Sequence, residues 1–339
     1  MDSSAEETKR RLTASIRATG AIAVGYAEAA PVSHEESDGF GRWLDGGNHA
    51  SMEWLARHEE LRRDPRLLLD GAKTVVSIAY PFFQPERRGA ALPQISMYAY
   101  GKDYHDVLRK KLRPVCRGLS ETTGCATRIC VDSAPVAERY WALKAGIGRR
   151  GDNGAVIIDG YGSFVFLCEL LTSLELPPDE PSGKECLHCG RCRGACPGKA
   201  ILPGGRIRAQ RCLSYLTVEH REAFPGEGES ADALNSPAGQ RTLYGCDMCQ
   251  LVCPCNAGAD ASLALPEFLP RNGEMLTLGA PEAMAMTDDE WTAFTASSAM
   301  RRARPARRGR AGTPPSPSAW ARPQRPPPQI IKGPNEGNR

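Results

Sequence analysis

The spacing of the cysteines restricts this chain more than any other feature. Cys186, Cys189, Cys192 and Cys196 follow one another as C-x2-C-x2-C-x3-C, and Pro197 comes next. This run is an iron–sulfur motif in which the fourth cysteine ligates the other of two [4Fe–4S] clusters. A second run, C-x2-C-x3-C-P, ends at Cys253. One C-x2-C alone would equally fit a zinc site, but two runs that both end in Cys-Pro favour clusters.

Exchange of the last cysteines between the two runs gives two sets of ligands. The first set is Cys186, Cys189, Cys192 and Cys253, and the second holds Cys196, Cys246 and Cys249 but lacks one thiolate. Cys212, in a predicted helix over 210–219, is the best candidate to complete the second set. Cys255 competes for that place, although it lies only two residues from Cys253. We also expect Cys196 to begin a helix that turns it away from the first cluster.

Composition supports this interpretation of the cysteines. The 339 residues contain 13 cysteines, an odd number without an export signal, which favours thiolate ligands in a reducing, cytoplasmic compartment over disulfides. The other cysteines, at 116, 125, 130 and 168, have no ligand spacing, and we expect them to pack in a core. No apolar stretch has the length of a membrane span, so we expect a soluble protein and no membrane partner.

The net charge of +3 conceals an uneven distribution. Residues 301–339 hold ten basic residues and one acidic residue, which leaves 33 basic and 39 acidic residues in 1–300, a balance of −6. The overall charge therefore does not indicate nucleic-acid binding, which would need a local patch. Arg206, Arg208, Arg211, His220 and Arg221 form one such set beside Cys212, although the same residues would also suit an ordinary solvated face.

We expect an α+β fold in four parts. Residues 1–175 should form an α/β, sandwich-like domain with strands at 21–27, 73–82 and 127–132, helices at 1–17, 104–119 and 138–145, and a hairpin of 155–159 with 163–171. Residues 176–260 should form a module like bacterial ferredoxins with two [4Fe–4S] clusters. Residues 261–304 should be a peripheral helical segment, and 305–339, rich in Pro and Arg, a disordered tail.

Several segments resemble the epoxyqueuosine reductase family. They are GKDYH from Gly101, VDSAPVAER from Val131, KAGIG from Lys144, RCLSYLT from Arg211 and YGCDMCQLVCP from Tyr244. The resemblance runs in order from about residue 5 to Arg302. It implies the final step of queuosine synthesis, the reduction of epoxyqueuosine at the wobble position of tRNA. It also implies cobalamin as a cofactor beside the two clusters, with electrons passing through the clusters to cobalamin.

The resemblance assigns roles to individual residues. Cys212 becomes the missing cluster ligand, and Asp132, the aspartate of the VDS motif, becomes the proton donor. The residues that match the family's cobalamin contacts are Arg62, Ser96, Asp132, Ile157, Ser214 and Asp247. A carboxylic acid donates a proton near neutral pH only if burial or negative charge raises its pKa, so we expect a raised pKa at Asp132. We expect Tyr104 and His105 to pack or to cap the helix after Asp103.

The sequence departs from the family in three places. Asp152 stands where the family usually has a lysine, and Cys255 replaces a larger residue. After Arg302 the family continues as a helix, whereas this chain becomes rich in proline and arginine. We hypothesise a frameshift near Arg304, which resequencing of the gene would test.

The expected partners are tRNA with epoxyqueuosine in its anticodon loop and a low-potential electron donor, and we expect a monomer. Two other functions fit the cysteine pattern. One is a related corrinoid iron–sulfur reductase of a small molecule, as in reductive dehalogenases, and the other is a non-catalytic two-cluster electron carrier. A carrier would bind no corrinoid, so an ultraviolet–visible spectrum after reconstitution with cobalamin would separate it from both enzymes.

Overall fold

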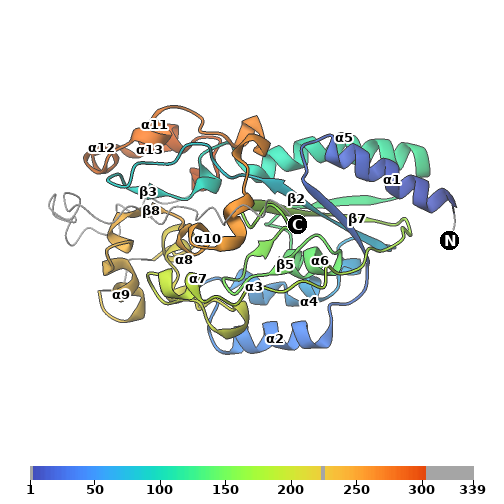
Figure 1. Cartoon of the computed structure of the whole chain (residues 1–339), viewed down its shortest axis with the longest axis horizontal. Helices are drawn as coiled ribbons and strands as arrows, with labels where there is room; N and C mark the ends of the chain where they lie inside the picture. Colours follow the sequence, from blue (N-terminus) through green and yellow to red (C-terminus); the bar gives the residue numbers. More distant parts are fainter. Residues whose placement is uncertain (1–2, 223–225, 303–339) are drawn as a thin grey trace, which may run out of the picture.

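The computed structural model describes residues 3–222 and 226–302 (Figure 1). The predicted disorder of 305–339 and the hypothesised frameshift fall outside these residues. Within the described ranges, no helix combines the length and the apolar character needed to cross a bilayer.

A four-stranded sheet forms the centre of the molecule. Its strands are β1 (Ala23–Glu28), β2 (Thr74–Pro81), β7 (Val165–Thr172) and β4 (Thr127–Cys130), in the order β1-β2-β7-β4. Every neighbouring pair is antiparallel. An antiparallel sheet covered by helices is an α+β arrangement, so the expected fold class is correct. The α/β description of residues 1–175 is wrong, because that class has a mostly parallel sheet.

Helices cover both faces of this sheet because its central strand is apolar on both sides. All of β2 is buried, and its alternate residues Val76 and Ile78 pack beneath α1 (Ser3–Arg17) and α5 (Tyr104–Thr123). Val75 packs on the opposite face with Trp141 of α6 (Glu138–Lys144). Figure 1 shows α1 and α5 on one side and α6 on the other. The expected strands and helices of this region are therefore confirmed.

Shorter elements surround this layer. On the α6 side lie α2 (His34–Asp45), α3 (Trp54–Arg57) and α4 (Glu59–Arg63) (Figure 1). The cysteine-rich part contains α7 (Arg191–Ala195), α8 (Leu213–Val218), α9 (Glu229–Asn235) and α10 (Met248–Leu251). A parallel pair, β3 (Gln94–Ile95) with β8 (Thr242–Tyr244), joins that part to the segment before α5.

The segment after 261 is helical as predicted but is not peripheral. It contains α11 (Glu274–Thr277), α12 (Ala280–Ala285) and α13 (Asp288–Thr295). Phe268, Met275 and Phe294 are buried in the same apolar cluster as the sheet. The backbone N–H of Lys102 donates to the carbonyl of Glu267 (2.7 Å), which fixes this segment against the start of α5. Its low helical periodicity had concealed this burial.

The predicted hairpin of 155–159 with 163–171 is wrong. The first stretch forms β6 (Val156–Ile157), which pairs instead with β5 (Arg149–Arg150). The second forms β7, which lies in the main sheet between β2 and β4. An isolated bridge joins Ile158 to Gly162, the residue before the second stretch. Apolar pattern alone could not distinguish a local partner from two distant ones.

Candidate functional site: two cysteine clusters beside an aspartate

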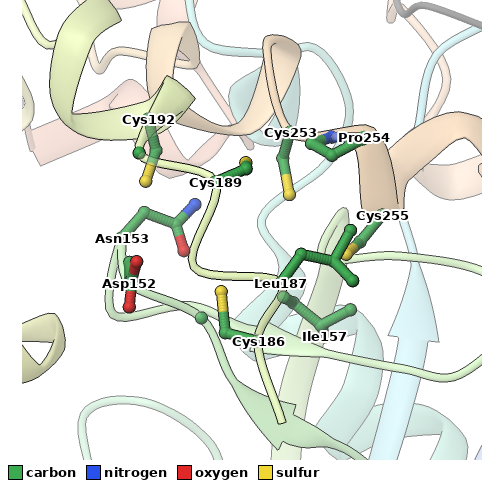
Figure 2. A pocket seen from close by; sticks show the side chains of 12 residues that line it. Asp152, Asn153, Ile157, Cys186, Leu187, Cys189, Cys192, Cys253, Pro254 and Cys255 are labelled. Atoms are coloured by element: carbon green, nitrogen blue, oxygen red, sulfur yellow. The ribbon is translucent and has the colours of Figure 1, made fainter.

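The first predicted set of cysteines lines one cavity. Cys186, Cys189, Cys192 and Cys253 all contribute to it, although Cys253 is more than 50 residues away in the sequence. Figure 2 shows their sulfur atoms around a common space. Asn153 also lines the cavity, and its buried Nδ2 has no hydrogen-bond partner among the described residues. A donor left free in this position fits a cluster, whose sulfur atoms accept hydrogen bonds.

The second set also converges. Burial, together with the charge of Cys249 and Cys212, raises the pKa of Cys246, and burial with the charge of Cys212 and Cys196 raises the pKa of Cys249. The four thiols therefore lie close enough to affect one another's pKa, although Cys192 of the first set also acts on Cys249. Metal binding requires the thiolate forms, so cluster assembly at this group releases protons.

The structure separates the two candidates for the eighth ligand. Cys212 lies near Cys196, whose charge contributes to its raised pKa after burial, and it packs against the same apolar cluster as Cys246. Cys255 lines the cavity of the first set and interacts with Cys253.

Two expected helix positions were wrong. The helix predicted over 210–219 begins at Leu213, so Cys212 is its N-cap and does not lie within it. Cys196 does not begin a helix but follows α7, which contains Cys192. The end of α7 nevertheless separates Cys196 from Cys192, as the exchange of ligands requires.

Gly198 permits close contact between the two cysteine-bearing segments. A Cβ atom at Gly198 would lie 1.8 Å from the carbonyl oxygen of Arg211, the residue before Cys212. We expect Gly198→Ala to separate Cys196 from Cys212, and therefore to lower bound iron by about four atoms per chain, one cluster of the [4Fe–4S] type. Iron analysis after anaerobic reconstitution measures this loss.

Gly194→Ala is the matched control for Gly198→Ala. Gly194 lies in α7, and a Cβ atom there meets nothing within 4 Å. Alanine also favours a helix over glycine, so this variant should keep its full iron content. Equal iron in both variants would contradict the packing argument.

Asp132 lies in the turn between β4 and α6, as predicted. Its backbone has a left-handed φ of 45°, and its N–H donates to Oε1 of Glu138 (2.6 Å). Its Oδ2 lies 3.0 Å from Nε2 of His105, whose Nδ1 lies 2.7 Å from Oδ1 of Asp103. The side chain is 56% exposed. A carboxylate is thus held at the surface by a chain of polar groups from the start of α5.

The expected rise in the pKa of Asp132 is not found. Burial of the group favours the neutral form, but the hydrogen bond and charge of His105, the Tyr104 hydroxyl and the charge of Arg62 together hold the pKa of Asp132 below its usual value. Asp132 is therefore ionised at neutral pH. A proton that it delivers must first come from its neighbours, and His105 is hydrogen-bonded to it.

Glu138 shows the opposite shift. Burial and the negative charge of Asp132 raise the pKa of Glu138 to about 8. An unfolded glutamate ionises near pH ~4.3, so the folded protein holds one more proton here between these two values. Stability must therefore fall as the pH rises from about 4.5 to about 8.

We expect Glu138→Gln to weaken this pH dependence. Glutamine can accept the same N–H bond from Asp132 and does not ionise, so its thermal midpoint should fall less between pH 5 and pH 8 than that of the wild type. Thermal unfolding of both proteins, prepared with the same cofactor content, gives the comparison. Glu169, whose pKa burial also raises, should leave part of the decline in the variant. Parallel curves would show that Glu138 is ionised in the folded protein.

The residues that match cobalamin contacts lie in several places. Ser96 donates to Asp247, which also accepts from the N–H of Met97 (2.8 Å). Arg62, in α4, contributes positive charge at Asp132. Ser214 lies in the first turn of α8. Ile157, in contrast, lines the cavity of the first cysteine set.

Arg62 gives the clearest indication of a missing ligand. Its Nε is buried and has no partner among the described residues, while its guanidinium lies over the ring of Trp54 (5.3 Å). An unsatisfied buried donor is costly unless a ligand accepts from it. The free donor of Arg62 and the half-exposed carboxylate of Asp132 fit a large polar cofactor, whereas Ser96 and Asp247 satisfy each other.

The predicted basic set is partly neutralised. Arg208 and Arg211 both pair with Oε1 of Glu229, at 3.0 Å and 3.1 Å. Asp152, the departure from the family's lysine, lines the first cavity, and its Oδ1 lies 2.8 Å from Nδ1 of His188. Neither pairing could be predicted from the sequence, because the partners are distant along the chain.

The sequence did not reveal Glu138 and revealed only part of the role of His105. The ring of His105 packs as expected, stacked on Tyr104 with 4.1 Å between centroids. The cap of α5, however, is Asp103, and the imidazole also bridges Asp103 to Asp132. Both residues stand within the segments GKDYH and VDSAPVAER. Their positions in these two family-like segments were the sequence signal that could have pointed to both residues.

Family models match two parts of the chain. Residues 62–133 match the model described as epoxyqueuosine reductase QueG, DUF1730, and residues 185–256 match a 4Fe–4S double cluster binding domain. The first match contains Asp132, and the second contains all eight predicted cluster cysteines. The two matches therefore cover Asp132 and the two cysteine sets, respectively.

Curated relatives and solved structures agree with these matches. The epoxyqueuosine reductase of Cyclobacterium marinum is 42% identical over 68% of this chain and 74% of its own, and that of Synechococcus sp. (strain RCC307) is 36% identical over 78% and 79%. An epoxyqueuosine reductase crystallised with an epoxyqueuosine-modified tRNA-Tyr stem loop superposes with a TM-score of 0.75 at 29% identity, over 86% of this chain and 76% of that one. The chain therefore belongs to the epoxyqueuosine reductase family.

Proposed function

We propose that this chain reduces epoxyqueuosine to queuosine in tRNA, with two [4Fe–4S] clusters as its electron path and Asp132 as the group that delivers a proton. Family membership makes it an oxidoreductase, an epoxyqueuosine reductase that acts on tRNA. The observation that carries the finer proposal is a chain of side-chain contacts from Asp132 to the second cysteine group. His105, 3.0 Å from Asp132, stacks on Tyr104. Tyr104 contacts Tyr98, whose ring centroid lies 6.0 Å from that of Tyr244, two residues before Cys246.

The eight cysteines hold the clusters in this proposal. Cys186, Cys189, Cys192 and Cys253 hold the first, and Cys196, Cys212, Cys246 and Cys249 hold the second. The first set takes three ligands from one segment and one from another, and the second takes two from one segment and one from each of two others. Neither cluster can therefore form unless the whole module is folded. Shared segments keep the clusters near each other, which suits the passage of single electrons.

Cobalamin is the cofactor expected near Asp132. The residues that would hold it are Arg62, with its free Nε, Asp132, Ser214 and the Ser96–Asp247 pair. Ile157, in β6, lines the cavity of the first cysteine set instead. When bound, cobalamin supplies the redox chemistry that no amino-acid side chain provides. The chain's own residues then bind and orient the tRNA base and control protons.

Proton supply at the epoxide is the task of Asp132. Conversion of an epoxide to an alkene consumes two electrons and two protons and releases water, so the departing oxygen must be protonated. Asp132 is ionised, but His105 Nε2 at 3.0 Å can pass it a proton. The base to be reduced lies in an anticodon loop, where unpaired bases are readily exposed. Such a substrate places the enzyme in the cytoplasm.

Nucleoside analysis tests this function. tRNA that carries epoxyqueuosine is incubated with the reconstituted protein, cobalamin and dithionite, then digested and analysed by mass spectrometry. The proposal predicts queuosine, and no conversion when cobalamin is omitted. Conversion without cobalamin would refute the cofactor, and a reconstituted protein that binds no corrinoid and converts no tRNA would be an electron carrier.

A further inference from the structure

The loop over the first cysteine set is exposed at one point. Cys189 is the only exposed member of the eight predicted ligands in the described part of the chain. Leu187, two residues earlier, is 62% exposed, the highest value among the large apolar side chains that the structure describes. An apolar side chain that remains in solvent beside a redox centre indicates contact with another molecule.

Charge around this loop is opposite to that of the rest of the protein. Residues 184–199 contain four basic residues and only one acidic residue, Glu185, whereas residues 1–300 carry −6 overall. Lys184 is paired with Asp159 (2.9 Å). Arg191 and Arg193 flank Cys192, are exposed, and form no ion pair with the residues that the structure describes. The free positive charge therefore lies next to the first set.

The loop is held in a fixed conformation. His188 has a left-handed φ of 47°, and its Nδ1 lies 2.8 Å from Oδ1 of Asp152. The ion pair between Lys184 and Asp159 holds the start of the loop to the segment that follows β6. A surface that is already ordered loses little entropy on binding, which suits brief and repeated encounters.

The second cysteine set is the one that side-chain contacts connect to Asp132. Tyr244, two residues before Cys246, contacts Tyr98, and Tyr98 leads through Tyr104 and His105 to Asp132. The first set faces the exposed loop instead (Figure 2). Electron transfer weakens steeply with distance, so a donor gains most by docking over Cys189.

We propose that the loop from Lys184 to Arg193 is the docking surface for a small acidic one-electron carrier protein. Leu187 would provide the apolar contact, and Arg191 and Arg193 would attract the acidic partner. Such contacts are small and depend on charge for their rate of association. This inference rests on the proposed function of the first set as a cluster site.

Stopped-flow reduction of the clusters tests the surface directly. A photoreduced acidic [2Fe–2S] ferredoxin is mixed anaerobically with the reconstituted, full-length protein, and loss of the clusters' visible absorption is followed at low and high salt. We expect Arg191→Glu/Arg193→Glu to slow reduction by the ferredoxin about tenfold or more at low salt, since steering changes association rates by ~10–10³-fold. Reduction by dithionite, which is itself an anion, should change less than about twofold at high salt, where charges are screened.

A control pair comes from α5. Arg113 and Arg117 are also exposed, and Arg113→Glu/Arg117→Glu makes the same change in net charge away from the loop. This control should be reduced by ferredoxin nearly as fast as the wild type. Leu187→Ser, which leaves charge unchanged, should also slow the ferredoxin and spare dithionite.

The outcomes separate this inference from the proposed function. Equal slowing in the α5 pair, or unchanged ferredoxin rates in both loop variants, would overturn the docking surface. Slowing with dithionite as well would also overturn it, because the defect would then lie in the clusters. Failure to convert tRNA, with loop-dependent reduction intact, would count against the proposed function alone.

Discussion

Asp132→Asn is expected to lower the rate of epoxyqueuosine reduction by about two to four orders of magnitude, the usual contribution of a general acid. Asparagine keeps the size of the side chain and can still contact Nε2 of His105, but it cannot take up and deliver a proton. Iron content and cobalamin-dependent absorption should stay close to those of the wild type. Single-turnover conversion of the modified tRNA measures the chemical step.

Asp106→Asn is the control for this result. Asp106 lies in the first turn of α5, next to His105. Its side chain is 71% exposed and pairs only loosely with Arg301 (3.7 Å). Removing its charge should change the rate less than about twofold, as expected for an exposed pair. If Asp132→Asn kept the wild-type rate, Asp132 would have no part in proton delivery, and His105 would become the better candidate.

Cys212→Ala should remove one of the two clusters, whereas Cys255→Ala should remove neither. Cys212 converges with Cys196, Cys246 and Cys249, so its loss leaves three ligands and should reduce bound iron from about eight to about four atoms. Reduction of epoxyqueuosine should become undetectable because the electron path is broken. Each variant removes one cysteine sulfur atom, and the two positions lie in neighbouring parts of one module. Each variant therefore serves as the control of the other.

Iron, sulfide and electron paramagnetic resonance measurements on both variants decide between the two cysteines. A loss of four irons in Cys255→Ala, with none in Cys212→Ala, would reverse the assignment of the eighth ligand. A loss in both would show that Cys255, which interacts with Cys253, also supports the first cluster.

The sequence was most informative where function depends on local spacing. The two cysteine runs predicted which thiols would converge, because three or four ligands within a few residues leave little freedom for the backbone. The main strands were also predictable, since β2 and β7 are largely apolar segments that only a covered sheet can bury. Asp132 was placed correctly at the end of β4 by the strand before it.

What could not be predicted depends on residues far apart in the chain. The pKa of Asp132 is lowered partly by His105, which reaches it from α5, and no local pattern shows that contact. The partner of β6 was wrong because Arg149 and Arg150 have no apolar pattern of their own. The burial of Phe268 and Met275 follows from docking near Gly101, where a Cβ would lie 2.4 Å from the backbone of Phe268.

Mössbauer spectroscopy and metal analysis of the anaerobically reconstituted wild-type protein test the central claim most directly. The account requires two cubane clusters whose ligands are exchanged between the cysteine runs. It predicts about eight iron and eight sulfide per chain, with spectra of the [4Fe–4S] type. Tightly bound zinc, or four irons that no reconstitution increases, would contradict it.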